Sequence, residues 1–236
     1  VENPDYKIRS NMMDYFLSSE ITLFYKFSTI ITDDYTIFCN EGFYDPQKKI
    51  GVFKKDAKVN SETRTIFGDS IFFDENKKYA SASRNIKIID EKENLIIKGE
   101  YAEVFEELDS ALITKNPVAI NITKTDSLFI KADTLISLGA YQNRKVIGYY
   151  NVRFVKGSMS GKSDKIKIDK SEGLTTLSRN DLTKRQIQIL SENEINKINP
   201  VIWDGNSQIS GDEIILKEDL DRNVIAVSYT HLRAHE

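Results

Sequence analysis

Residues 68–73 read Gly-Asp-Ser-Ile-Phe-Phe. Related hexapeptides stand at residues 99–104 (Gly-Glu-Tyr-Ala-Glu-Val), 130–135 (Ile-Lys-Ala-Asp-Thr-Leu) and 161–166 (Gly-Lys-Ser-Asp-Lys-Ile), each starting 31 residues after the one before. A further copy at 211–216 (Gly-Asp-Glu-Ile-Ile-Leu) starts 50 residues after the fourth, which indicates an insertion ahead of it. Together with weaker copies toward the N-terminus, this spacing predicts a protein built from about six repeats of ~31 residues.

A second apolar element follows within each repeat, at residues 85–88, 117–120, 151–154 and 200–203. In both elements apolar residues alternate with polar or mixed ones, and Ile, Val and Phe dominate. This pattern is typical of β-strands that bury one face. Aligning the copies gives two apolar columns: Phe73, Val104, Leu135, Ile166 and Leu216 in the first, and Ile88, Ile120, Phe154 and Trp203 in the second.

Turn-forming residues separate the apolar runs, which predicts antiparallel strands joined by tight turns. One such repeat cannot bury its own apolar face, but stacked repeats can. The predicted turns are Asp45-Pro46-Gln47-Lys48, Asp74-Glu75-Asn76-Lys77, Asp90 to Asn94, Asp169 to Gly173 and Asp204-Gly205-Asn206.

Several of these segments, taken in order and at repeat spacing, resemble the OstA-like (LptA-type) family over roughly residues 11–216. The chain departs from the family pattern in the insertion after Asn180. The segments that carry the resemblance are Cys39 to Asp45, Gly68 to Asp74, Ile97 to Glu103, Lys131 to Leu135, Asn199 to Trp203 and Gly211 to Glu213.

The resemblance implies an all-β, antiparallel β-taco or β-jellyroll, an open U- or V-shaped roll with an apolar groove. It further implies a non-enzymatic protein of the Gram-negative periplasm that carries lipopolysaccharide to the outer membrane. The chain would act either as a bridge component or as the periplasmic domain of the outer-membrane assembly protein. Its partners would be the acyl chains of lipid A, and other β-taco proteins or further copies of itself stacked head to tail through edge strands. The nine column residues become the predicted lipid-binding lining of the groove, with Phe73, Phe154 and Trp203 serving as core, as lining, or as both.

The composition of the chain limits the classes of protein to which it can belong. The chain has 236 residues and a net charge of −3, which argues against a nucleic-acid partner and equally against a polybasic membrane-surface protein. Cys39 is the only cysteine, so no internal disulfide forms, and we expect it to be a buried apolar side chain. The sequence contains neither an apolar run long enough for a membrane-spanning helix nor an export signal. It opens at Val1 rather than Met, and we expect the native N-terminus to lie further upstream.

We expect one repeat domain over residues 1–226, in which residues 181–198 form a short helix or an ordered loop. Residues 227–236 (Val-Ser-Tyr-Thr-His-Leu-Arg-Ala-His-Glu) back-translate to a sequence that resembles a transposon-end sequencing adapter. We therefore expect this tail to be foreign. His231 and His235, the only histidines, lie in it, which removes any histidine-based catalytic or metal site from the remaining chain.

No enzyme, cofactor or metal is predicted. The acidic residues fall mainly in turns and at repeat starts, where turn and capping roles suffice, and no ligand cluster has metal-site spacing. Asp133 and Asp164 are interpreted as structural hydrogen-bonding residues. Lysine and glutamate at alternate strand positions predict a solvated outer face; examples are Lys87, Glu103, Lys165 and Lys167. The alternative function is a structural or adhesive β-repeat protein that binds no lipid, in which the same strands are packed shut.

Overall fold

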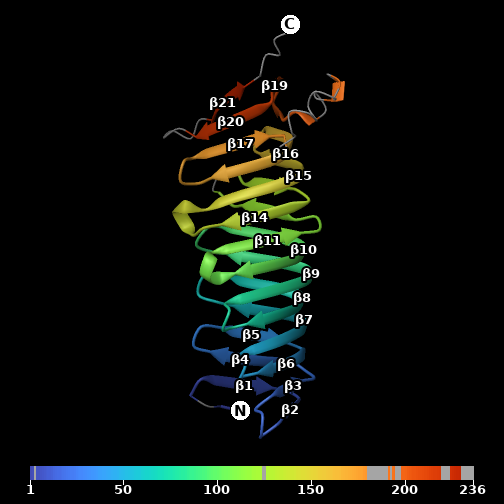
Figure 1. The fold of residues 1–236 in the computed structure, drawn as a ribbon, viewed down its shortest axis with the longest axis vertical. Helices are drawn as coiled ribbons and strands as arrows, with labels where there is room; N and C mark the ends of the chain where they lie inside the picture. The colour runs from blue at the N-terminus through green and yellow to red at the C-terminus, as the bar shows by residue number, and fades with distance from the viewer. Residues whose placement is uncertain are drawn as a thin grey trace. The chain divides into compact units, whose positions relative to one another are not determined.

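The computed structural model describes residues 1–2, 4–123, 126–179, 191, 193–194, 198–218 and 224–229. The described chain is an all-β, antiparallel structure that divides into two compact units, Val1–Lys115 and Asn116–Glu236. None of the described helices is long and apolar enough to cross a membrane. Figure 1 shows the strands following one another in chain order within each unit.

Unit 1 contains eleven described strands and one short 3-10 helix. The strands are β1 (Tyr6–Ser10), β2 (Met13–Tyr15), β3 (Thr22–Phe24), β4 (Ser28–Thr32), β5 (Thr36–Cys39), β6 (Glu41–Asp45), β7 (Ile50–Asn60), β8 (Thr65–Asp74), β9 (Tyr79–Asp90), β10 (Leu95–Phe105) and β11 (Ser110–Thr114), and the helix is η1 (Glu106–Leu108).

Unit 2 contains ten described strands and a second 3-10 helix. The strands are β12 (Val118–Asn121), β13 (Leu128–Lys131), β14 (Thr134–Leu138), β15 (Lys145–Lys156), β16 (Met159–Asp169), β17 (Leu174–Ser178), β18 (Val201–Asp204), β19 (Ser207–Ser210), β20 (Glu213–Glu218) and β21 (Val224–Tyr229), and the helix is η2 (Tyr141–Asn143).

The long strands of unit 1 each belong to two walls. Pairing between β7, β8, β9 and β10 breaks in the middle of the strands and resumes after one to three residues. One set of half-strands, with β2, β3, β6 and β11, forms wall A; the other set, with β1, β4 and β5, forms wall B. In Figure 1 these four strands lie side by side. Each strand therefore crosses from one wall to the other at a corner.

In β7 and β9 the corners are made by paired residues in left-handed backbone conformation. Lys55 and Asp56 in β7 both have φ of 59°, and Arg84 and Asn85 in β9 have φ of 61° and 51°. Non-glycine residues rarely adopt this conformation, and Asn and Asp tolerate it best. The Asn85 side-chain amide donates to both carboxylate oxygens of Asp69 on β8, at 3.1 Å each. A cross-strand hydrogen bond thus fixes the position of the bend.

Inward-facing residues form continuous apolar rows across the strands of unit 1. The wall B row is Ile8, Ile30, Ile37, Val59, Ile66, Ile88 and Ile97, which the strand register places directly opposite one another. The main wall A row is Phe53, Ile71, Ala82, Ala102 and Ile113. All twelve side chains are buried. Their burial is the main favourable term in the folding of unit 1, at roughly 1.5–3 kcal/mol for each large side chain.

Unit 2 repeats this construction. β15 bends at Tyr150 and Asn151, with φ of 62° and 52°, and the Asn151 amide donates to Asp133 at 2.7 Å. The interpretation of Asp133 as a hydrogen-bonding residue is confirmed. We call the two walls of this unit A2 and B2. Wall A2 contains β14, β17, β20, β21 and one half each of β15 and β16; wall B2 contains β12, β13, β18, β19 and the other halves.

The predicted turns lie where expected, and a buried carboxylate organises several of them. Asp45, Asp74 and Asp90 each accept a hydrogen bond from the backbone amide three residues later, at 3.0–3.1 Å. Each carboxylate accepts a hydrogen bond from a turn N–H that has no partner in the strand ladder.

Two sequence expectations fall partly outside the described residues. Of the predicted insertion 181–198, only Ser191, Asn193, Glu194 and Ile198 are described. β21 includes Val227–Tyr229, the first three residues of the tail expected to be foreign, and residues 230–236 lie outside the described chain. The division into one repeat domain and a tail therefore remains a prediction.

The corner model predicts that Asn151→Ala lowers the free energy of unfolding by about 1–2 kcal/mol, because alanine tolerates left-handed backbone poorly and cannot bond Asp133. Asn151→Gly should cost less, because glycine adopts this backbone freely. Urea denaturation measures both, with Asp133→Ala reporting the hydrogen bond alone. Equal losses for the alanine and glycine variants would contradict a backbone cause.

Candidate functional site

The candidate site is the apolar interior between the two walls of each unit. In unit 1, inward side chains of wall B (Val59, Ile66) and of wall A (Phe73, Ala80, Val104) line one small cavity. Its volume is about 20 Å³, room for about one water molecule. The two apolar walls therefore face each other and are packed almost to contact.

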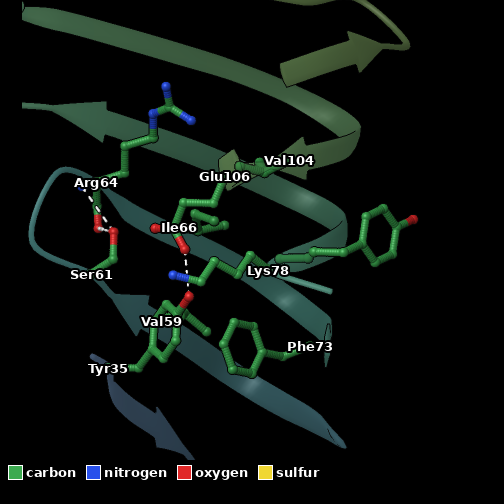
Figure 2. A pocket seen from close by; sticks show the side chains of 11 residues that line it. Tyr35, Val59, Ser61, Arg64, Ile66, Phe73, Lys78, Val104 and Glu106 are labelled. Atoms are coloured by element: carbon green, nitrogen blue, oxygen red, sulfur yellow. Dashed lines mark hydrogen bonds between the residues drawn. The ribbon is translucent and has the colours of Figure 1, made fainter. Parts of the chain in front are cut away.

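At the corners the two walls of unit 1 are continuous, and we call their opposite edges, where the turns lie, the rims. Polar side chains join the two rims across this cavity. Tyr35, in the wall B turn between β4 and β5, donates its hydroxyl to the Glu106 carboxylate on the rim of wall A, 2.5 Å away. Its ring packs edge-on against Phe73, with ring centroids 4.6 Å apart. Figure 2 shows the hydroxyl of Tyr35 pointing at Glu106 beside the apolar lining. We call this contact the Tyr35–Glu106 latch.

Two further contacts join the same rims. The guanidinium of Arg64, in the wall B turn after β7, lies 3.5 Å from the carboxylate of Asp109, which follows η1 on wall A. Tyr6 on β1 packs edge-on against Tyr44 on β6, with centroids 6.1 Å apart. The opening between the rims of unit 1 is thus closed by polar and aromatic contacts, while the space behind it is apolar.

Burial and the neighbouring carboxylate control the protonation of the latch. Desolvation of the phenol, followed by its hydrogen bond to Glu106, raises the pKa of Tyr35 far above its ordinary value. Tyr35 therefore remains a hydrogen-bond donor throughout the physiological pH range.

Unit 2 has a comparable interior. A cavity of about 40 Å³ is lined by Phe154 and Met159 of wall B2 and by Ile166 and Leu216 of wall A2. Phe154 packs over Gly161 on the next strand, where an added Cβ would lie 2.2 Å from the ring, so glycine is required there.

Seven of the nine predicted lining residues lie in these interiors. Phe73 and Val104 share a wall A row, and Leu135 and Ile166 share a wall A2 row through the intervening Gly148. All seven are buried: Phe73, Ile88, Val104, Leu135, Phe154, Ile166 and Leu216. Their lipid-binding role remains a prediction.

Ile120 and Trp203 lie on the opposite, outer face of wall B2. The register pairs Ala119 with Ile130, Ile130 with Phe154, and Gly161 with Ile202, so the inward positions are Ala119 and Ile202. Both are buried, whereas Trp203 is exposed. The second predicted column is therefore one residue out of register at these two copies, and a shift of one residue moves a side chain to the other face of a strand.

Sequence reasoning missed the residues that join the rims. Tyr35 and Arg64 each follow a hydroxyl residue by three positions, and the hydroxyl oxygens of Thr32 and Ser61 accept their backbone N–H groups at 3.2 Å. That turn signature was available in the sequence. The partners Glu106 and Asp109 lie far along the chain, and no local pattern points to them.

Cys39 is buried on the inner face of wall B, as expected. Desolvation raises the pKa of its thiol to about 12, so it stays protonated and poorly nucleophilic. Within the described part of the chain, no group of three or more His, Cys, Asp or Glu side chains could hold a metal ion.

A charged cluster stabilises the rim of wall A2. The carboxylate of Asp169 accepts the Ser171 hydroxyl at 2.6 Å and lies 3.0 Å from the Lys145 ammonium and 3.4 Å from that of Lys167. The hydrogen bond from Ser171, followed by that from Lys145, holds the pKa of Asp169 well below its ordinary range.

The comparisons with known proteins are sparse. No protein-family model matches the chain, and no curated protein matches its sequence. Among solved structures, it matches the crystal structure of LptH, the LptA homologous periplasmic component of the conserved lipopolysaccharide transport device from Pseudomonas aeruginosa. The match has a TM-score of 0.27 and 10% sequence identity, and covers 76% of this chain and 85% of LptH.

The Asp169 cluster predicts a defined pH dependence. Because the folded pKa is depressed, its stabilisation is complete above the ordinary carboxyl pKa of about 3.9 and is lost as pH falls toward the folded value. Asp169→Asn should lower the free energy of unfolding at pH 7, and its deficit relative to the native chain should shrink at pH 3. Urea titrations at both pH values measure this, with Asp164→Asn on the same strand as control. A deficit that is the same at both pH values would contradict the assignment.

Proposed function

We propose that this chain is a non-enzymatic lipid carrier that takes the acyl chains of lipopolysaccharide between its two walls. The observation that carries the proposal is the pair of facing apolar rows in each unit. In unit 1 the inward row of wall B continues through seven strands without a polar residue. Lipopolysaccharide itself comes from the sequence resemblance, which also implies the periplasm and delivery to the outer membrane.

The energetics permit such a role if the walls can separate. Cavities of about 20 and 40 Å³ are too small for an acyl chain. A buried acyl chain gains roughly 0.8 kcal/mol per CH₂, so a chain of myristoyl length gains on the order of 10 kcal/mol. A bound acyl chain would replace wall-to-wall apolar contacts with lipid-to-wall contacts. The main local free-energy cost of opening unit 1 is therefore the loss of the contacts between the rims.

The corners are suitable hinges for this separation. Each wall keeps its own cross-strand hydrogen bonds, whereas the two walls of unit 1 are joined at the rims by side chains. A change of backbone angle at Lys55–Asp56 and Arg84–Asn85 would open the rims without unpairing a strand.

The close packing of the described interior favours one other function, a structural or adhesive repeat protein with no lipid ligand. Such a protein needs the same apolar rows but never opens its rims. The two functions differ in whether interior residues contact lipid.

Photo-crosslinking separates these two functions. A benzophenone amino acid at Phe73 points into unit 1, whereas the same group at neighbouring Phe72 points outward. We expect a lipopolysaccharide adduct from position 73 and not from position 72 when the exported chain is irradiated. Equivalent inward and outward positions in unit 2 are Ile166 and Lys165. Folded protein that gives no adduct at either inward position would support the structural role.

The Tyr35–Glu106 latch predicts a faster uptake of lipid when it is removed. A hydrogen bond to a charged group contributes about 1.5–3 kcal/mol, so Tyr35→Phe should shift the closed-to-open equilibrium at least about tenfold. Uptake of a fluorescent fatty acid by stopped flow measures the change. The matched control is Tyr44→Phe, whose hydroxyl donates to Glu75 on its own wall and does not join the rims. Equal uptake rates in both variants would show that the latch does not limit opening.

A further inference from the structure

The outer face of wall B2 carries two parallel rows of side chains with different chemistry. The first row is mainly apolar. In strand order it contains Ile120, Phe129, Val155, Ser160 and Trp203, each opposite the next in the register. Phe129, Val155 and Trp203 are 45%, 48% and 38% exposed. Exposed apolar side chains that are aligned on one face mark an interaction surface more often than scattered ones do.

The second row is cationic and lies two residues along the same strands. Lys131 pairs directly with Arg153, and Arg153 with Lys162, on three neighbouring strands. Like charges placed directly opposite destabilise a sheet. In the described part of unit 2 none of these three side chains has an ion pair with a carboxylate. The acidic residues of β12, β13, β15, β16, β18 and β19 are Asp164 at the bend of β16, the buried Asp169, and Asp204 at the exposed end of β18. None of them lies opposite Lys131, Arg153 or Lys162 in the strand register.

We propose that the outer face of wall B2 docks on the headgroup layer of an anionic membrane. Lys131, Arg153 and Lys162 would contact lipid phosphates, and Phe129, Val155 and Trp203 would insert among the upper parts of the acyl chains. This surface lies on the opposite side of the wall from the interior, so the inference goes beyond carriage of a lipid within the fold.

Charge complementarity and side-chain type together favour a membrane. Clustered basic residues are attracted to anionic bilayers by about 1 kcal/mol each, which corresponds to roughly fivefold in partitioning. Trp is enriched at membrane interfaces because its ring is apolar and its N–H is polar. The Trp203 indole N–H donates to Gln208 on the adjacent strand at 3.0 Å, which satisfies the polar group while the ring remains exposed.

The outer face of wall B in unit 1 has related chemistry. One cross-strand row there contains Arg9, Phe38, Lys58, Phe67, Lys87 and Lys98. The Lys58 ammonium lies 5.4 Å from the ring centroids of both Phe38 and Phe67. Cations and aromatic rings thus lie side by side on this outer face as well.

Trp203 is the only tryptophan of the chain, so its fluorescence reports this surface alone. We expect vesicles of equal parts phosphatidylglycerol and phosphatidylcholine to shift its emission to shorter wavelength and to sediment with the full chain. Pure phosphatidylcholine vesicles should do neither at the same lipid concentration. The combined Lys131→Gln, Arg153→Gln and Lys162→Gln variant should lose about 100-fold in partitioning. The Phe129→Ser, Val155→Ser variant should lose the emission shift.

The matched control is Lys48→Gln, Lys77→Gln and Lys92→Gln, which removes the same charge from exposed rim positions of unit 1. It should weaken partitioning less than about threefold, because these lysines lie outside the cationic row. Equal losses in both triple variants, or equal binding to both kinds of vesicle, would overturn the proposal. A shift produced by inorganic phosphate alone, or by a single-stranded oligonucleotide and not by vesicles, would equally overturn it. Crosslinking from Phe73 reports the interior separately, so the two proposals can fail independently.

Discussion

The constraint on which the rest of the structure depends is that a long strand must bend in its own middle without losing its neighbours. Paired left-handed residues accomplish this in β7 at Lys55–Asp56, in β9 at Arg84–Asn85 and in β15 at Tyr150–Asn151. A flat strand would have one buried and one exposed face along its whole length. A strand bent at a fixed point turns its two inner faces toward each other, so a single chain segment supplies both sides of an apolar interior. The carboxylate of Asp69 on β8, or of Asp133 between β13 and β14, aligns the bend with the strand beside it.

Much of this architecture is visible in the sequence because it is local. The period-two alternation predicts the strands, and the Asp-initiated turns predict where they end, since both depend on residues within a few positions of each other. The corners were missed because Asn and Asp in left-handed backbone resemble an ordinary turn, although here the strand continues beyond them. Ile120 and Trp203 were misplaced because Val118–Ile120 and Val201–Trp203 are apolar at successive positions, so alternation does not identify the inward residue. The latch pairs residues 71 positions apart, and no local pattern contains that information.

The two faces of wall B2 differ in chemistry, because successive side chains along a β-strand point to opposite faces of the sheet. Its inner face is mainly apolar, with Ser163 buried beside Val152. Its outer face combines a row of three cations with exposed aromatic and aliphatic side chains, and no acidic residue lies opposite those cations in the strand register. A sheet that only needs to be soluble would mix both charges on its outer face. The unbroken row of three cations beside exposed apolar groups is the feature on which the proposed membrane contact rests.

The buried thiol of Cys39 provides an intrinsic probe for the opening of unit 1. The thiol lies on the inner face of wall B and is 1% exposed, so a thiol reagent can reach it only when the walls part or the unit unfolds. With a single cysteine in the chain, every modification event is assigned without ambiguity. The rate of labelling in native buffer then measures how often the interior of unit 1 is accessible, with no mutation introduced into the fold.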